Sequence, residues 1–364
     1  MFLICSNCNM VHEKGRGATL NGESRRFNLP ERQADGDWLD ALTDIDGEPA
    51  RLRTEVTVER PRTIISRNSS PDIAFSQSIN AYRGCEHGCI YCFARPTHAY
   101  HDLSPGLDFE TKLFVKPEAA TLLRTELGKK NYTVSPIAMG TNTDPYQPIE
   151  KDWRITRQVL EVFAETRHPT YITTKSDRIL QDIDLLADLA RDRLVAVMIS
   201  VTSLDPKIAR TLEPRAPHPL RRIEAIRRLA AAGIPVSANM APIVPAITDH
   251  EIESVVARVA EAGARDISYI LVRLPHEVAP LFRAWLEEHY PDRAAKVMGI
   301  IRDIRGGRDN DPDFGTRMRG QGVWPALIRT RFLRARRQAG LGGDRLTLRR
   351  DLFRPPESTQ LRLF

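Results

Sequence analysis

Short apolar runs alternate with amphipathic stretches through the middle of the chain. The apolar runs, rich in β-branched residues, fall at 78–82, 135–141, 170–174, 194–202, 234–240 and 266–274. The stretches with apolar residues at helical spacing fall at 153–165, 179–191, 220–233 and 250–263. Buried strands with amphipathic helices between them are typical of a parallel sheet that helices cover.

This alternation repeats about six times, which is three-quarters of an eight-unit barrel. We therefore predict an α/β fold whose core, residues 61–277, is a partial (β/α)6 TIM-like barrel. An open Rossmann-type sheet is the alternative, but no G-x-G-x-x-G follows the first strand. In barrels, chemistry takes place at the carboxyl ends of the strands, so candidate residues are sought there.

The segments that flank this core have other patterns. Residues 1–60 are polar and aperiodic, which predicts an irregular N-terminal leader. Residues 278–350 predict a helical, arginine-rich C-terminal extension in which Pro291 separates two helices and a basic helix follows. Residues 351–364 predict a proline-containing tail without a packed fold.

Composition is that of a globular protein, since 41% of the 364 residues are hydrophobic and 27% are charged. No stretch approaches the ~20 apolar residues that a bilayer span requires. The opening MFLIC is apolar for only five residues and has no basic start, unlike a signal peptide. We therefore expect a cytoplasmic protein with no membrane partner.

Positive charge is concentrated near the C-terminus. The whole chain has a formal net charge of +6, whereas residues 302–350 carry 13 arginines against five aspartates, with no lysine or glutamate, a net charge of +8. Guanidinium groups favour two-point contacts with phosphate or carboxylate, so DNA is a candidate partner. A GC-rich genome would explain the same choice of arginine.

All five cysteines lie before residue 93, which makes a poor disulfide framework and favours metal binding. Cys85, Cys89 and Cys92 have the spacing C-x3-C-x2-C within one loop. Three thiolates can hold three irons of a cubane cluster and leave the fourth iron open to an amine and a carboxylate of another molecule. A zinc site completed by His87 or His98 is the alternative.

A second pair of cysteines, Cys5 and Cys8, lies in the predicted leader. A structural zinc site needs two more ligands, of which His12 would supply one, and no fourth is evident. An incidental pair is therefore the favoured interpretation.

The cysteine loop resembles the signature of the radical S-adenosylmethionine (SAM) superfamily. That signature follows the first strand of a partial barrel, and the match includes Tyr91, an aromatic residue that in the family lies against the SAM adenine. More narrowly, YRGCEHGCIYCFARPTHAY is similar to the spore photoproduct lyase branch, which repairs DNA. The resemblance implies a 4Fe–4S cluster on the three cysteines, SAM on the open iron, cleavage of SAM to a 5′-deoxyadenosyl radical, and a flavodoxin- or ferredoxin-type electron donor.

The same resemblance suggests a contact for the SAM amine at the end of the second strand. Gly140, Thr141 and Asn142 take the place of the family's Gly-Gly-Glu segment. The glutamate is absent, so the backbone, Asn142 or Asp144 would have to replace it. A simple turn explains the same residues, because Asn, Asp and Pro are turn formers.

Four residues after the third and fourth strands are further candidate contacts for SAM. Lys175 and Arg215 would pair with the SAM carboxylate, and solvated loop positions are the alternative for both. Ser200 and Thr202 resemble the ribose-contacting position and lie on one face of their strand. Simple β-propensity would also explain Thr202.

The predicted barrel mouth holds four further candidates. Asn239 and Arg273 would point into the mouth from the fifth and sixth strands, and a buried arginine needs a partner. Tyr82 and Tyr146 are either hydrogen-atom donors or walls of the site, and walls are favoured. Tyr82, Tyr146 and Arg273 are therefore the candidate catalytic residues.

The last five residues, Gln360-Leu361-Arg362-Leu363-Phe364, are similar to the peptide by which bacterial polymerases and repair proteins bind the sliding clamp. Leu361, Leu363 and Phe364 would fill apolar pockets on that partner while Gln360 orients the peptide. Packing of this segment on its own domain is the alternative.

Three functions stay open on this basis. The first is a radical SAM enzyme that repairs or processes DNA. No cysteine follows Cys92, whereas spore photoproduct lyase uses a further cysteine as hydrogen donor, so thymine-dimer reversal by that route is not expected. The second is modification of RNA, a peptide or a metabolite. The third is a non-enzymatic iron–sulfur protein docked on the sliding clamp.

Overall fold

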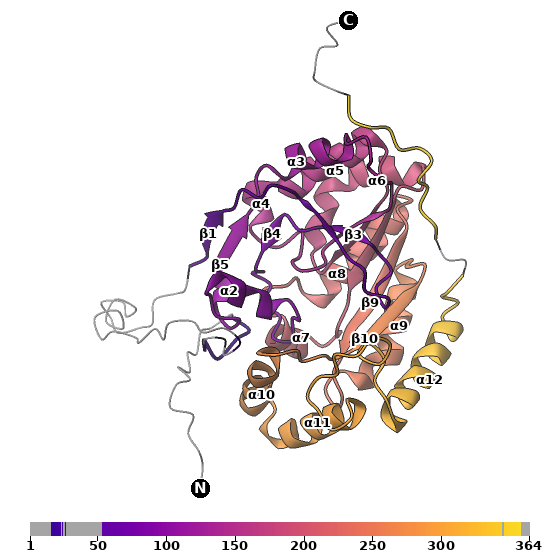
Figure 1. Cartoon of the computed structure of the whole chain (residues 1–364). Coiled ribbons are helices and arrows are strands. Elements are labelled where there is room, and N and C mark those ends of the chain that lie inside the picture. Colours follow the sequence, from indigo (N-terminus) through magenta and orange to yellow (C-terminus); the bar gives the residue numbers. More distant parts are fainter. Residues whose placement is uncertain (1–15, 23, 25, 27–52, 344–345, 358–364) are drawn as a thin grey trace, which may run out of the picture.

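The centre of the molecule is a sheet of six parallel strands with an antiparallel strand, β2, at one edge (Figure 1). The computed structural model describes residues 16–22, 24, 26, 53–343 and 346–357. The strands, in their order across the sheet, are β10 (Ile267–Leu271), β9 (Val236–Ile243), β8 (Val195–Ser200), β7 (Thr170–Thr174), β6 (Ile137–Met139), β3 (Gln77–Ile79) and β2 (Ile65–Arg67). Among these described strands β10 does not pair with β2, so the barrel stays open, and the predicted α/β fold with a partial barrel is confirmed.

Helices connect successive strands and cover the sheet. They are α3 (Ala119–Leu127), α4 (Glu150–Trp153), α5 (Ile155–Thr166), α6 (Ile183–Arg191), α7 (Pro206–Leu212), α8 (Pro219–Ala231) and α9 (Ile252–Glu261). Their ends follow local rules. The Asp205 side chain accepts from the backbone N of Lys207 at the start of α7, and Gly233, with φ of +73°, follows the end of α8 as a left-handed glycine.

A second, three-stranded sheet lies beside the main one and was not predicted. Its order is β1 (Glu55–Val58), β5 (Lys112–Val115) and β4 (Tyr82–Arg83). The run at 78–82, read as one strand, is therefore two strands, because β3 and β4 belong to different sheets. The predicted leader also needs correction, since β1 lies within it and pairs in parallel with β5, far along the chain.

Short helices follow the cysteine loop and flank two other loops. They are η1 (Arg95–His101), α2 (Asp108–Thr111), η2 (Asp177–Asp182) and η3 (Asp249–Glu251). The C-terminal extension adds α10 (Val278–His289), α11 (Pro291–Ile304) and α12 (Val323–Gln338). The break between α10 and α11 falls at Pro291, as predicted. Ile328, Phe332 and Ala335 repeat at helical spacing on α12 and are buried.

The segment after α12, which we call the C-terminal strap (residues 346–357), corrects the prediction of an unpacked tail from residue 351. The backbone N of Arg354 donates to the Thr166 carbonyl (2.8 Å), and the Phe353 ring lies 5.4 Å from His168. Leu348 is buried. These contacts join residues that are far apart in the sequence, so the local pattern of residues does not predict them.

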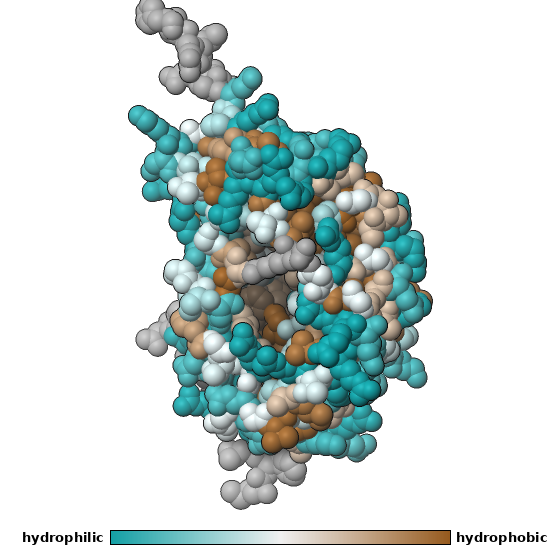
Figure 2. All heavy atoms as spheres, turned by 90° about the vertical axis from the view of Figure 1, so that its right-hand side faces the viewer, coloured by the Kyte–Doolittle hydropathy of each residue, from teal (hydrophilic) through white to brown (hydrophobic). Residues whose placement is uncertain are grey.

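Figure 2 views the molecule from the right-hand side of Figure 1, where the yellow C-terminal strap runs. This face is largely hydrophilic around a hollow that hydrophobic residues line. The C-terminal strap contacts residues that precede β7 and β8, such as Thr166 and Arg193. The candidate residues come from the other, carboxyl ends of the strands. None of the described helices is long and apolar enough to span a bilayer.

Candidate functional site

The cysteine loop (residues 85–92) begins directly after β4 and folds back on itself. The backbone N of Gly88 donates to the Cys85 carbonyl (3.3 Å), and that of Cys92 donates to the Cys89 carbonyl (3.2 Å). Gly88 adopts a φ of +67°, which glycine tolerates best. Two short turns therefore fold the segment that carries the three cysteines back on itself.

The three thiols are unbridged and close together. Cys92 packs against the apolar groups that contain Cys85 and Cys89. Burial, with the charges of Asp144 and Cys89, raises the pKa of Cys85, and burial raises that of Cys89 to about 12. Buried thiolates are therefore stable only beside cations. This donor set fits three irons of a cubane cluster.

The zinc alternative finds no support in the placement of the histidines. His98 Nε2 lies 2.8 Å from the Lys112 carbonyl oxygen, and His87 Nδ1 lies 3.4 Å from an Asp144 oxygen. Within the described part of the chain, no three His, Cys, Asp or Glu side chains converge on a position for one metal ion.

The buried guanidinium group of Arg95, which the sequence analysis did not identify, stabilises the cysteine loop. Arg95 donates from Nε to the Cys89 carbonyl (2.9 Å) and from Nη2 to the Gly88 carbonyl (3.1 Å). Its Nη2 also pairs with Glu110 at 2.5 Å, and both side chains are fully buried. These bonds hold the carbonyls of Gly88 and Cys89, so the ion pair between Arg95 and Glu110 stabilises the conformation of the cysteine loop.

The N-terminal segment 16–22 packs on the same loop, which is a second correction to the predicted leader. The backbone N groups of Gly17 and Ala18 donate to Glu110, each at 2.9 Å. A Cβ on Gly17 would lie 1.7 Å from the Gly88 carbonyl oxygen, so only glycine permits this approach. The signal available in the sequence was the Gly-Arg-Gly run, whose glycines indicate close contact of backbones.

Asp144, considered as a partner for the SAM amine, is occupied by protein donors. It accepts from the Thr174 hydroxyl (2.6 Å) and the backbone N of Lys175 (2.8 Å). Burial would raise its pKa, but His87 and these hydrogen bonds hold the pKa at about 2. Asp144 thus ties the ends of β6 and β7 to the cysteine loop as a charged residue.

The other residues of this segment differ in accessibility. Gly140 has a φ of +84°, and a Cβ there would lie 1.9 Å from the Thr173 carbonyl oxygen, so a glycine is required. The Asn80 side chain binds Thr141 and the backbone N of Asn142. The Asn142 side chain is exposed and available to a ligand.

A buried polar network lies next to Cys89. Glu213 accepts hydrogen bonds from the Tyr91 and Thr202 hydroxyls, the second at 2.7 Å. Arg222 Nη1 lies 2.5 Å from its other oxygen, an ion pair outside hydrogen-bond geometry, and both side chains are almost fully buried. Lys175 Nζ lies 5.8 Å from the centre of the Tyr91 ring. Burial disfavours both charges, yet Arg222 and Lys175 lower the pKa of Glu213, and Cys89 and Glu213 raise that of Lys175.

This network brings together three predicted residues, Tyr91, Lys175 and Thr202, with two that were missed. Glu213 was overlooked although it adjoins Leu212 in the segment that contains Arg215. Arg222 lies four residues before Ile226 on the apolar face of α8, a position where an arginine signals a buried partner. The Lys175 ammonium group forms no hydrogen bond or ion pair with the described residues, so it can meet an anion.

Three other predicted contacts lie near the network but have protein partners. Arg215 Nη2 lies 3.2 Å from Glu86, within the cysteine loop. The Ser200 carbonyl accepts from Arg222 (3.3 Å), and Asn239 accepts from Ser268 (3.1 Å). The ion pair of Arg215 with Glu86 leaves it less suited to the SAM carboxylate than Lys175.

The two tyrosines named as catalytic candidates are buried in the core. The Tyr82 hydroxyl donates to Glu150, and the Tyr146 hydroxyl donates to Asp182 (3.1 Å). Burial raises the pKa of Glu150 to about 7. Their burial favours a role for both tyrosines as walls of the site rather than as hydrogen-atom donors, as the sequence analysis also favoured. Arg273 follows β10 and lies beside Met318, at the open edge of the sheet.

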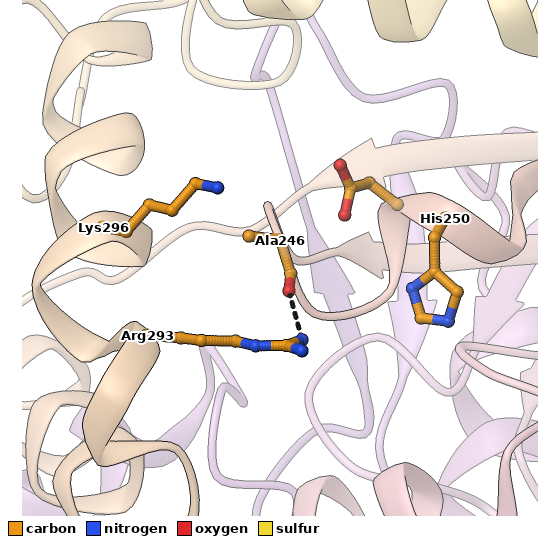
Figure 3. Close-up of a pocket in the computed structure, with 5 residues that line it drawn as sticks. Ala246, His250, Arg293 and Lys296 are labelled. Atoms are coloured by element: carbon orange, nitrogen blue, oxygen red, sulfur yellow. Dashed lines mark hydrogen bonds between the residues drawn. The ribbon is translucent and has the colours of Figure 1, made fainter.

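A surface cavity of about 470 Å³ lies between the loop after β9 and the start of α11. Figure 3 shows its lining, which includes Ala246, His250, Arg293 and Lys296, with Arg293 donating to the Ala246 carbonyl (3.2 Å). None of the predicted site residues lines this cavity.

Some predicted sites fall outside the described residues. These are Cys5, Cys8 and His12 of the leader, and Gln360, Leu361, Leu363 and Phe364 of the terminal peptide.

Comparison with known proteins places this arrangement in a family. Residues 79–259 match the Radical SAM superfamily. An uncharacterized protein of Mycobacterium tuberculosis is 34% identical over 240 residues, which are 65% of this chain and 71% of that protein. A radical SAM Nα-GlyT isomerase of Pseudomonas phage M6 is 24% identical over 246 residues, 66% of this chain and 49% of that protein.

Solved structures agree on the fold. A spore photoproduct lyase mutant superposes with a TM-score of 0.52 over 78% of this chain and 79% of that chain, at 16% identity. That likeness concerns the fold alone. The matched region of the sequence and the Mycobacterium relative establish that this chain is a member of the radical SAM superfamily of enzymes.

Proposed function

We propose that the chain holds a 4Fe–4S cluster through Cys85, Cys89 and Cys92, binds SAM beside it, and acts on DNA. Membership of the superfamily indicates an enzyme that uses such a cluster to cleave SAM, which sets aside a purely structural cluster. When bound and reduced, the cluster would supply a 5′-deoxyadenosyl radical that takes a hydrogen atom from the substrate.

The observation that carries the cofactor proposal is the charged network next to Cys89. Lys175 presents an ammonium group that would meet the SAM carboxylate. Tyr91 is held through its hydroxyl by Glu213, with Thr202 beside it, and would lie against the adenine. Because Glu213 and Arg222 are paired in the core, these groups are oriented before the ligand arrives.

Two features of the sequence support DNA as the substrate. The support is the +8 charge of residues 302–350 and the terminal peptide. Part of that charge is used within the protein, because Arg331 pairs with Glu253 (2.6 Å) and Arg336 with Asp266 (2.7 Å). RNA, a peptide or a metabolite is therefore the second candidate class of substrate.

Anaerobic reconstitution tests the proposal. The protein is loaded with iron and sulfide, reduced with dithionite in place of the electron donor, and given SAM with intact DNA, damaged DNA or RNA. We expect 5′-deoxyadenosine, in larger amount when DNA is present, and none from a Cys92→Ala control. No product under any condition would contradict the enzymatic proposal, whereas stimulation by RNA alone would replace DNA as the substrate.

The terminal peptide is proposed to bind the sliding clamp. Surface plasmon resonance on immobilised clamp would compare the full chain with a chain that lacks residues 360–364 and with one in which Leu361 and Phe364 are alanine. Equal binding by all three would contradict this partner.

A further inference from the structure

In the described part of the chain, an ion pair rather than strand pairing joins the two edges of the main sheet. Asp72 lies in the loop between β2 and β3, at one edge. Arg317 lies in the segment between α11 and α12, next to β10 at the other edge. Its Nε donates to Asp72 Oδ2 and its Nη2 donates to Asp72 Oδ1, each at 2.5 Å. In Figure 1 the indigo segment of β2 and β3 crosses toward the orange region near β10.

Arg305 anchors this crossing from inside. It is only 3% exposed, and it donates from Nη2 to the Val272 carbonyl (2.8 Å) and from Nη1 to the Arg317 carbonyl (2.6 Å). One guanidinium thus holds the end of β10 and the segment that carries Arg317. Its Nε is buried and has no hydrogen-bond partner among the described residues.

Among the described residues, Arg273 has neither a carboxylate partner like that of Arg317 nor carbonyl acceptors like those of Arg305. Its Nε is buried without a hydrogen-bond partner in the described part of the chain, and its Nη1 meets only the Met318 sulfur, a weak acceptor, at 3.5 Å. Burial and Arg317 lower the pKa of Arg273, although Asp72 opposes the shift. Burial and Arg273 lower the pKa of Arg305 to about 10.

Charge is unbalanced at this edge. Three guanidinium groups, of Arg273, Arg305 and Arg317, share two carboxylates, of Asp72 and Asp311. An arginine that is half-buried and repelled by its neighbours is costly unless an anion joins it. One more negative group would balance the charge of these three arginines.

An aromatic ring stands beside the same group. Phe314 is 56% exposed, and the Arg317 guanidinium carbon lies 4.5 Å from the ring centre. An exposed ring next to arginines is the combination with which proteins bind single strands, since a base stacks on the ring while a guanidinium meets the phosphate. An acidic peptide would satisfy the arginines but offers no base to Phe314.

We propose that Arg273, Arg317 and Phe314, here called the edge site and supported from inside by Arg305, bind a single strand of DNA at the open edge of the barrel, with a phosphodiester on Arg273 and a base on Phe314. This assignment rests on the proposed function, of which it names the substrate contact. Asp72 then competes with the phosphate for Arg317.

Fluorescence anisotropy of a labelled single-stranded oligodeoxynucleotide, at several salt concentrations, tests the edge site on the full, cluster-loaded chain. Arg273→Gln should raise Kd roughly tenfold and reduce the salt slope by about one. Phe314→Ala should raise Kd about tenfold and leave the slope unchanged. Arg228→Gln, an exposed arginine on α8, is the matched control and should bind as wild type.

Asp72→Asn supplies a change of opposite sign. Without its carboxylate Arg317 is free for the phosphate, so Kd should fall about threefold. Weaker binding by this variant would mean that the pair only holds the fold, and would overturn the site. Tighter binding of an RNA strand of the same sequence would assign the edge site to RNA and overturn DNA as its ligand.

The edge site and the proposed function fail in different ways. If wild type and Arg273→Gln bind the oligonucleotide equally while DNA stimulates formation of 5′-deoxyadenosine, the edge site is wrong and the substrate class stands. If wild type binds no oligonucleotide and DNA does not stimulate SAM cleavage, both fall.

Discussion

Replacing Glu213 by glutamine removes one charge from the network next to Cys89 while keeping the size of the side chain. Glutamine still accepts from Tyr91 and Thr202, but it no longer neutralises Arg222, which is 1% exposed. Glu213→Gln should therefore leave a guanidinium, and the nearby Lys175, without the carboxylate that balances them.

The expected magnitude follows from the burial of the pair. Breaking a buried ion pair by removing one partner costs about 3–5 kcal/mol, mostly the penalty of the charge left behind. At about 2–4 °C per kcal/mol for a large domain, the melting temperature should fall by roughly 6–20 °C. The matched control is Glu261→Gln on α9, whose surface pair with Arg258 should be worth less than about 1 kcal/mol.

The double variant Glu213→Gln/Arg222→Met separates the pair from other effects. Removing both charges leaves neither one buried alone, so the loss of unfolding free energy should be smaller in the double variant than in Glu213→Gln. Calorimetry would give the stabilities, and titration of the cluster-loaded protein would show weaker SAM binding in Glu213→Gln. A loss no larger than that of Glu261→Gln, or strictly additive losses in the double variant, would refute the reasoning.

Three further predictions concern the fold around the site. The pKa of Glu150 is about 7 in the folded state against 4.5 for the unfolded chain, so the folded state binds this proton more tightly. The free energy of unfolding should therefore decline by about 3 kcal/mol as pH rises from 4.5 through 7. In urea titrations at several pH values, Glu150→Gln should flatten that decline. Gly17→Ala forces a methyl group against the Gly88 carbonyl, so it should cost about 1–3 kcal/mol and reduce the iron retained after reconstitution; full iron content and stability would contradict the packing. Phe353→Ala should lower the free energy of unfolding by about 2 kcal/mol, measured by thermal unfolding, because its ring contacts are lost. An unchanged free energy of unfolding would mean that the C-terminal strap is not packed on the domain.

Local periodicity was enough to predict the parallel strands of the main sheet, but not its antiparallel edge strand β2. The strands after residue 130 and their helices recur at short, regular intervals, and Pro291 marks the boundary between α10 and α11. The small sheet was missed because β1 pairs with β5 more than 50 residues later, in short strands whose own pattern is weak. Contacts of that kind are set by the assembled fold.

The sequence was enough to propose ligands for the candidate site, but not the residues that support them. The spacing within one loop identified Cys85, Cys89 and Cys92 as candidates, and the position at a strand end identified Lys175. Glu213 becomes visible only when Arg222 reaches it from another helix. In a sequence, a buried charged residue looks the same as an exposed one, because its partner in the folded structure is not visible there.

The central claim is that three cysteines hold a cluster whose remaining iron binds SAM. The most direct measurement is the electron paramagnetic resonance spectrum of anaerobically reconstituted, reduced protein before and after SAM is added, together with metal analysis. The account predicts about four iron atoms per chain and a spectrum that changes with SAM. Zinc in place of iron, or an iron spectrum that SAM leaves unaltered, would contradict it.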